Sequence, residues 1–183
     1  MAARIVILNG VGSAGKGSIA KALQAITTDP FLHVEMDAFL NMLPESSFGD
    51  PDGLIFETTQ DGGKPLVSNK AGPIVIRALR GMRHAIAAMA EAGNNLIVDD
   101  VMLNGEMAEY KTLLSAFDVF LVGVFAPLDV LEARERQRGD RQIGLARWQY
   151  DRVHKGKSYD LEVDTGSATP LECAQLIKQE FGL

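Results

Sequence analysis

The amino-acid sequence predicts an α/β fold with a parallel sheet, because short apolar runs alternate along the chain with segments long enough for helices. Two further features fit this arrangement. A glycine-rich turn follows the first apolar run, and an arginine-rich segment lies between the last two. We expect strands at residues 4–8, 31–36, 95–98, 119–124 and 161–163.

The composition is that of a soluble globular protein, and 183 residues are enough for a single domain over residues 1–183. No apolar run approaches the roughly 18 residues of a membrane helix, and the N-terminus lacks the pattern of a signal peptide, which favours the cytoplasm. A single cysteine, Cys173, excludes an intrachain disulfide framework, and a net charge of −6 gives no footprint for nucleic acid. We therefore expect a small-molecule partner, and a homo-oligomer stays open.

Two helices have clear start or stop signals. After Pro73, apolar residues recur at spacings of three and four, and Gly93 marks the end of that helix. Near the C-terminus, Thr169 precedes Pro170 and Glu172, which is the pattern of a capped helix start.

The segment from about 44 to 72 breaks this pattern, because it is rich in turn residues. We expect an insertion over one end of the sheet, with a short hairpin at Asp61-Gly62-Gly63. Apolar residues in and before this insertion could line a pocket for an aromatic molecule or belong to the core: Phe39, Leu40, Met42, Leu43 and Phe56.

The glycine-rich turn matches a phosphate-binding motif. Seven residues between a predicted strand and a predicted helix fit the first seven positions of G-x-x-x-x-G-K-[ST]: Gly10, Val11, Gly12, Ser13, Ala14, Gly15 and Lys16. Such a loop turns its backbone N–H groups around phosphate oxygens, and its lysine adds a mobile positive charge. The alternative is a glycine-rich turn with a solvated lysine.

The eighth position departs from the motif. Gly17 stands where the pattern supplies a hydroxyl for Mg²⁺, and Ser18 follows one residue later, about 100° further round the helix. Phosphate binding tolerates this change more readily than metal ligation does. Ser18 is the hydroxyl that remains near the loop as a candidate metal ligand.

Carboxylates follow two of the predicted strands. Asp99 and Asp100 end the third strand, where one of them could hold Mg²⁺ through water; a solvated turn or a helix cap is the alternative. Asp37 ends the second strand and could take the proton of an acceptor hydroxyl during phosphoryl transfer. Its position equally suits an N-cap for a helix that begins near Ala38.

Arginines crowd the segment before the last predicted strand. Helical spacing places Arg134, Arg138 and Arg141 on one face, where arginine forks would suit the equatorial oxygens of a phosphoryl group in transfer. We interpret residues 134–155 as a lid over the phosphates. The alternative is a surface helix whose arginines pair with nearby acidic residues: Glu132, Glu135 and Asp140.

Five segments together carry a family resemblance: ILNGVGSAGKGS, EMDAFL, LIVDDV, VGVFAPLDVLEARERQRGDR and VHKGKSYDLEVDT. They resemble the chloramphenicol 3-O-phosphotransferases, a branch of the P-loop small-molecule kinases, from about residue 4 to the C-terminal helix. The resemblance implies a P-loop NTPase-type five-stranded parallel sheet flanked by helices, with an arginine-bearing lid. It also implies transfer of the γ-phosphate of ATP to a primary hydroxyl of the antibiotic, so ATP and Mg²⁺ are the expected cofactors.

The resemblance assigns roles to particular residues. The phosphate loop of the family corresponds to Gly10 to Ser18, its proposed catalytic base to Asp37, and its arginine lid to Arg134, Arg138 and Arg141. The family pattern has Lys-Ser-Gly where this chain has Lys-Gly-Ser.

Three functions stay open at this point. A small-molecule O-kinase with a chloramphenicol-type acceptor is favoured. A metabolite or nucleotide kinase on the same scaffold would need acceptor-side charges, of which the insertion offers few. A nucleotide-dependent switch or binding protein would have no use for Asp37 beside an acceptor hydroxyl, so this residue discriminates best.

Overall fold

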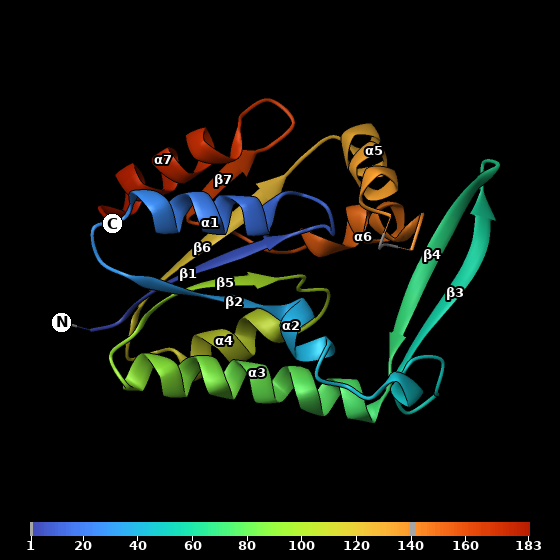
Figure 1. Ribbon diagram of the computed structural model, residues 1–183, viewed down its shortest axis with the longest axis horizontal. Helices are drawn as coiled ribbons and strands as arrows, with labels where there is room; N and C mark the ends of the chain where they lie inside the picture. Colours follow the sequence, from blue (N-terminus) through green and yellow to red (C-terminus); the bar gives the residue numbers. More distant parts are fainter. Residues whose placement is uncertain (1, 140–141) are drawn as a thin grey trace.

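The computed structural model describes residues 2–139 and 142–183, which fold around a central five-stranded parallel sheet (Figure 1). The strand order is β2-β5-β1-β6-β7, and every neighbouring pair is parallel. The bounds are β1 (Arg4–Gly10), β2 (Phe31–Glu35), β5 (Asn95–Asp100), β6 (Asp118–Phe125) and β7 (Leu161–Asp164). The predicted fold class and all five predicted strands are confirmed, with ends that differ by up to two residues.

Helices cover both faces of this sheet. Figure 1 shows α1 (Lys16–Ile26) and α7 (Pro170–Phe181) on one face, with α3 (Pro73–Glu91) and α4 (Glu106–Leu113) on the other. Successive residues of β1 therefore enter different cores. Val6 and Leu8 pack beneath α1 and α7, whereas Ile5 and Ile7 pack beneath α3 and α4. This double burial explains why the central strands read as continuous apolar runs.

The two predicted helix signals are present. Thr169 accepts a hydrogen bond from the backbone N–H of Glu172, and the Glu172 carboxylate accepts one from the backbone N–H of Thr169. Helix α3 begins at Pro73 and ends at Glu91, and Gly93 follows with a left-handed φ of 91°. Within the described residues, no helix combines the length and the apolar character that a membrane span requires.

The insertion contains a longer hairpin than the sequence predicts. Short helices α2 (Met36–Leu40) and η1 (Glu45–Ser47) lead into strands β3 (Leu54–Asp61) and β4 (Lys64–Ala71), which pair antiparallel. The turn lies where predicted, because Gly62 and Gly63 adopt φ values of 56° and 77°. Figure 1 shows the hairpin standing apart from the central sheet.

Beyond β6, the chain forms two helices joined by a short connection. Helix α5 (Leu128–Arg138) is capped by Gly139, whose φ is 69°, and α6 (Leu145–Val153) follows. The predicted helix that would carry all three arginines on one face is therefore longer than the helix that forms. Arg134 and Arg138 belong to α5, which stops at a left-handed glycine, and Arg141 lies outside the described residues.

Polar contacts join α5, α6 and the hairpin. The Glu135 carboxylate accepts hydrogen bonds from the backbone N–H groups of Gly144 (2.7 Å) and Ala146 (2.8 Å) at the start of α6. The Val67 N–H of β4 donates to the Gly144 carbonyl at 3.1 Å. Glu132 accepts hydrogen bonds from the Lys64 ammonium at 3.3 Å and from the Arg147 guanidinium of α6. The hairpin and the two helices thus form one connected wall.

Candidate active site

The glycine-rich loop connects β1 to α1 and has the backbone shape that its sequence predicts. Gly15 has a φ of 90°, which favours glycine, and Gly10 packs so closely on β6 that a Cβ would lie 2.5 Å from the Val124 carbonyl oxygen. The Gly12 N–H donates to Gln149 Oε1 of α6 at 2.8 Å. The loop therefore contacts the α6 wall directly.

Lys16 lies folded against its own loop. Its Nζ donates to the carbonyl oxygens of Gly10 (3.0 Å) and Val11 (3.1 Å) and lies 3.4 Å from Asp99 Oδ1. The side chain is only 6% exposed. A buried ammonium needs such partners, because desolvation without them would be costly. The alternative of a solvated lysine is therefore wrong.

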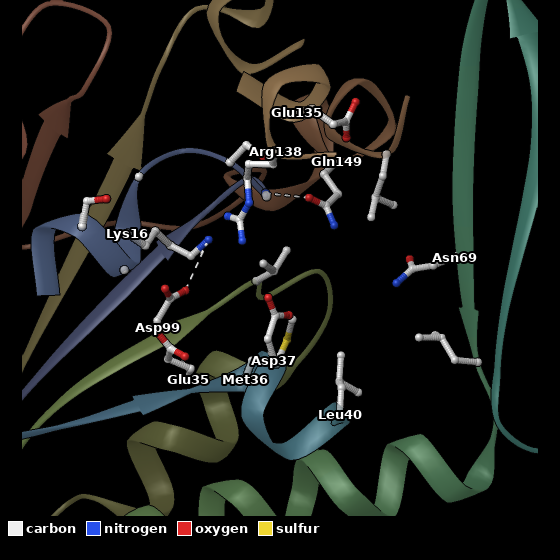
Figure 2. Close-up of a pocket in the computed structure, with 18 of the residues that line it drawn as sticks. Lys16, Glu35, Met36, Asp37, Leu40, Asn69, Asp99, Glu135, Arg138 and Gln149 are labelled. Carbon is white, nitrogen blue, oxygen red and sulfur yellow. Dashed lines mark hydrogen bonds and ion pairs between the residues drawn. The ribbon is translucent and has the colours of Figure 1, made fainter. Parts of the chain in front are cut away.

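A cavity of about 510 Å³ opens in front of this loop (Figure 2). It is lined by most of the loop: Gly12, Ser13, Gly15, Lys16, Gly17 and Ser18. The remaining loop residues, Gly10, Val11 and Ala14, are not among the lining residues, and Val11 and Ala14 are buried. Asp37, Asp99 and Arg138 line the same cavity from three other elements, and Figure 2 shows Arg138 pointing into it.

Asp37 reaches this cavity from the first turn of α2. The helix begins at Met36, and its N-cap position is Glu35, which makes no side-chain capping bond. The N-cap alternative for Asp37 is therefore wrong, because the helix starts one residue before it. Asp37 instead lines the cavity that Lys16 and Asp99 also line.

The two aspartates at the end of β5 point to opposite faces of the sheet, as the period of a strand requires. Asp99 lines the phosphate-loop cavity. Asp100 is only 3% exposed and accepts hydrogen bonds from the Tyr110 hydroxyl (2.8 Å) and the Val101 N–H (2.7 Å). Asp100 therefore lies on the wrong face to act with Asp99, and its prediction as a metal ligand is not supported by this geometry.

Arg134 lies beside the loop without lining its cavity. Its guanidinium donates to Thr165 Oγ1 (2.9 Å) and to the Thr165 carbonyl oxygen (2.7 Å). The Thr165 hydroxyl in turn donates to the Ala14 carbonyl oxygen at 2.8 Å. Arg134 therefore holds the segment after β7 against the loop. Glu132 and Glu135, offered as its alternative partners, are occupied by the contacts between the hairpin and α6.

Comparison with known proteins identifies the family. The model of the chloramphenicol phosphotransferase-like proteins matches residues 3–182. The chain belongs to this family. A Mycobacterium tuberculosis protein provisionally named an O-phosphotransferase is 30% identical over 185 aligned residues, which cover 97% of this chain and 82% of the relative. The predicted family resemblance is thus confirmed.

Solved structures extend the likeness of this phosphotransferase-like chain at the level of the fold. The APS kinase of Mycobacterium tuberculosis, solved with AMPPNP and APS, has a TM-score of 0.69 at 16% identity, covering 99% of this chain and 98% of its own. A gluconokinase from Sinorhizobium meliloti has a TM-score of 0.64 at 16% identity, covering 99% and 92%. The phosphotransferase-like chain therefore shares the fold of P-loop kinases.

A second cavity, of about 610 Å³, adjoins the first in this phosphotransferase-like protein. The two share lining residues from α2, the hairpin and α6, among them Leu40, Asn69 and Gln149. Four basic side chains line the second cavity: Lys70, Arg83, Arg152 and Lys155. The positive charge of the second cavity therefore comes mainly from α3, α6 and the residues after α6, rather than from the insertion.

The apolar residues predicted for a pocket divide between several places. Leu40 and Phe56 line the first cavity, whereas Phe39 packs on the core beneath α3. Met42 is 71% exposed, and Leu43 is half-buried. The sequence could not separate these roles, because they depend on where the hairpin lies.

Buried Asp100 makes the stability of this phosphotransferase-like protein depend on pH. Burial raises the pKa of Asp100 from 3.8 to about 6. A raised pKa in the folded state means that the contribution to stability is full below the unfolded pKa and is lost as the pH rises through about 6. A shift of roughly two pKa units corresponds to about 3 kcal/mol.

We expect this dependence to disappear in Asp100→Asn, which cannot titrate. Urea unfolding of both proteins at about pH 3.5 and about pH 7 measures it. The free energy of unfolding of the wild type, minus that of the variant, should fall by about 3 kcal/mol between the two pH values. An equal difference at both pH values would contradict the buried, titrating carboxylate.

Proposed function

We propose that this protein transfers the γ-phosphate of ATP to a hydroxyl of a small molecule. One observation carries the proposal: Lys16, Asp37 and Asp99 line one cavity with Arg138, although they come from four separate elements. A phosphate loop, a carboxylate and an arginine in one cavity are the parts that phosphoryl transfer requires. Family membership supports the same reaction class.

The proposed reaction uses each of these groups at a stated atom. The loop N–H groups and Lys16 Nζ hold the β- and γ-phosphates. Asp37 accepts the proton of the acceptor hydroxyl, whose oxygen forms a bond to the γ-phosphorus while the bond to the β,γ-bridging oxygen breaks and ADP leaves. Arg138 stabilises the charge on the transferring group. Mg²⁺, when bound with ATP, neutralises charge on the β- and γ-phosphate oxygens.

A chloramphenicol-type acceptor is the first substrate to test. The family description names this antibiotic, and the first cavity has apolar walls from Met36, Leu40, Leu54 and Phe56. Apolar walls of this kind suit the aromatic part of an acceptor, while Asp37 and Arg138 in the same cavity are charged groups that its hydroxyl could meet. Asp37 lines the same cavity. This position favours a kinase over a nucleotide-dependent switch, because a switch has no acceptor hydroxyl for the carboxylate to deprotonate.

A second candidate is a kinase of an anionic metabolite. The adjoining cavity carries Lys70, Arg152 and Lys155, all exposed, together with buried Arg83. Arg83 is already bonded to Glu109 at 2.6 Å, so the three exposed cations are the ones available to a carboxylate or phosphate group of an acceptor. Trp148, which lies under the Arg152 guanidinium at 4.8 Å, adds a flat apolar surface to this cavity.

A panel assay separates these candidates. ADP release from ATP is measured with chloramphenicol, with other neutral hydroxyl compounds, and with hydroxy acids and sugar phosphates. Turnover that rises only with neutral compounds supports the chloramphenicol-type acceptor, and turnover that rises only with anionic ones supports the metabolite kinase. Nucleotide binding without any acceptor-dependent turnover would favour the switch.

The contribution of Arg138 can be tested on the same helix. We expect Arg138→Ala to lower kcat more than it weakens ATP binding, because arginine contacts strengthen as charge develops in the transition state. Arg136→Ala is the matched control, because Arg136 is exposed on α5 and does not line the cavity. If both variants only shift the melting temperature, α5 is a surface helix without a catalytic arginine.

A further inference from the structure

Gly17 raises the question of what holds Mg²⁺ at this phosphate loop, because the motif places a hydroxyl at that position. A Cβ on Gly17 would lie 3.5 Å from Asp99 Oδ2 and 3.6 Å from Glu35 Oε1. The place where the motif puts its hydroxyl is therefore bordered by two carboxylates. We propose that Glu35, paired with Asp99, supplies the metal-binding oxygen that the loop lacks.

The fold brings these carboxylates together. Glu35 ends β2 and Asp99 lies near the end of β5, and the two residues are direct partners in the parallel register. Both line the phosphate-loop cavity, and Figure 2 shows them near each other below Lys16. Their side chains are 45% and 20% exposed, so both are open to a ligand in the cavity.

One ammonium and one imidazole lie near this pair of carboxylates. Lys16 Nζ lies 3.4 Å from Asp99 Oδ1, and His33 Nδ1 lies 3.5 Å from Glu35 Oε1. Two neighbouring carboxylates repel each other when both are ionised, and a cation between them removes that cost. When ATP is bound, its phosphates attract Lys16, so the carboxylate pair needs a further positive charge.

The coordination chemistry of Mg²⁺ fits this arrangement. Mg²⁺ keeps several waters and is usually held by one or two carboxylates together with phosphate oxygens of the nucleotide. No group of three His, Cys, Asp or Glu side chains that could hold a metal unaided occurs in residues 2–139 and 142–183. Glu35 and Asp99 therefore bind the ion together with the nucleotide, an inference that rests on the nucleotide site of the proposed function.

The test measures binding and not turnover. The affinity for the non-hydrolysable analogue AMPPNP is measured by calorimetry with and without Mg²⁺, in the wild type, Glu35→Gln, Gly17→Ser and the double variant. We expect Glu35→Gln to reduce the Mg²⁺-dependent gain in affinity by about 10-fold to 100-fold, with affinity in the absence of Mg²⁺ retained. Gly17→Ser should restore the gain in the double variant, because the distances at Gly17 are those of ordinary contact and leave room for serine.

Two further variants provide a control and a test of the alternative ligand. Glu91→Gln, at the exposed end of α3, is the matched control and should behave as the wild type. Ser18→Ala tests the other hydroxyl of the loop. If Ser18→Ala loses the Mg²⁺-dependent gain and Glu35→Gln keeps it, Ser18 is the ligand and the inference is wrong. A double variant that does not recover would likewise overturn it.

The outcomes for the inference and for the proposed function are distinguishable. A wild-type protein that binds AMPPNP neither with nor without Mg²⁺ would refute the nucleotide site itself, and the inference with it. A wild type that gains affinity with Mg²⁺, beside a Glu35→Gln variant that gains as much, would refute the inference alone. Melting curves of each variant show whether a loss of binding reflects a loss of folding.

Discussion

Asp37→Asn is expected to retain ATP binding while phosphoryl transfer falls by about 10²–10⁴-fold, which is the usual contribution of a positioned general base. Asparagine keeps the shape of the side chain but cannot accept the proton of the acceptor hydroxyl. The measurement is kcat with the acceptor that the panel identifies, together with the dissociation constant for ATP. The loss should appear in kcat and not in ATP binding.

Asp29→Asn is the matched control, because Asp29 is exposed in the turn between α1 and β2 and is not among the residues that line the site. Its activity should equal that of the wild type. Near-wild-type transfer by Asp37→Asn would remove Asp37 from the mechanism. That result would make the nucleotide-dependent switch the favoured function.

Lys16→Ala is expected to abolish measurable transfer. In the proposed reaction the Lys16 ammonium contacts the β- and γ-phosphates, and losing a group that stabilises the transition state costs about 10²–10³-fold. The variant also leaves Asp99 without the ammonium that lies 3.4 Å from it. ATP binding should therefore weaken as well, because the uncompensated carboxylate repels the phosphates.

Lys111→Ala, a change of an exposed lysine on α4, controls for the loss of one positive charge. It should bind and turn over ATP as the wild type does. Unchanged nucleotide affinity and turnover in Lys16→Ala would refute the phosphate-loop interpretation. A melting curve of Lys16→Ala is needed beside the assay, since its side chain is buried.

The centre of the sheet was predictable because β1 and β5 are buried on both faces and so read as apolar runs. The loop was predictable because its motif is continuous in sequence. The position of Glu35 beside Asp99 was not predictable, because it depends on β2 lying beside β5, and a sequence does not state the order of its strands. Gln149 was missed for the same reason, since it meets Gly12 from a distant helix.

Two features of the site could have been predicted more closely from the sequence alone. Asp99 and Asp100 are adjacent in a strand, so the strand period of two already places them on opposite faces. Gly139 offers a left-handed helix end between Arg138 and Arg141, which argues against a continuous arginine face. The length of the hairpin was harder to predict. Most of its residues are exposed or half-buried, and its contact with the start of α6 joins segments that are far apart in the sequence.

The hairpin lines both cavities from outside the central sheet. Its base is fixed, because the Gly72 N–H donates to the Gly53 carbonyl at 2.6 Å and a Cβ on either glycine would collide with backbone. Between these two points, one continuous stretch of chain supplies Leu54, Phe56 and Asn69 to the cavities, while the phosphate loop follows β1 and Asp99 lies in β5. If the proposed function is right, exchange of that stretch alone changes part of the wall that faces an acceptor and leaves Lys16, Asp37 and Asp99 in place.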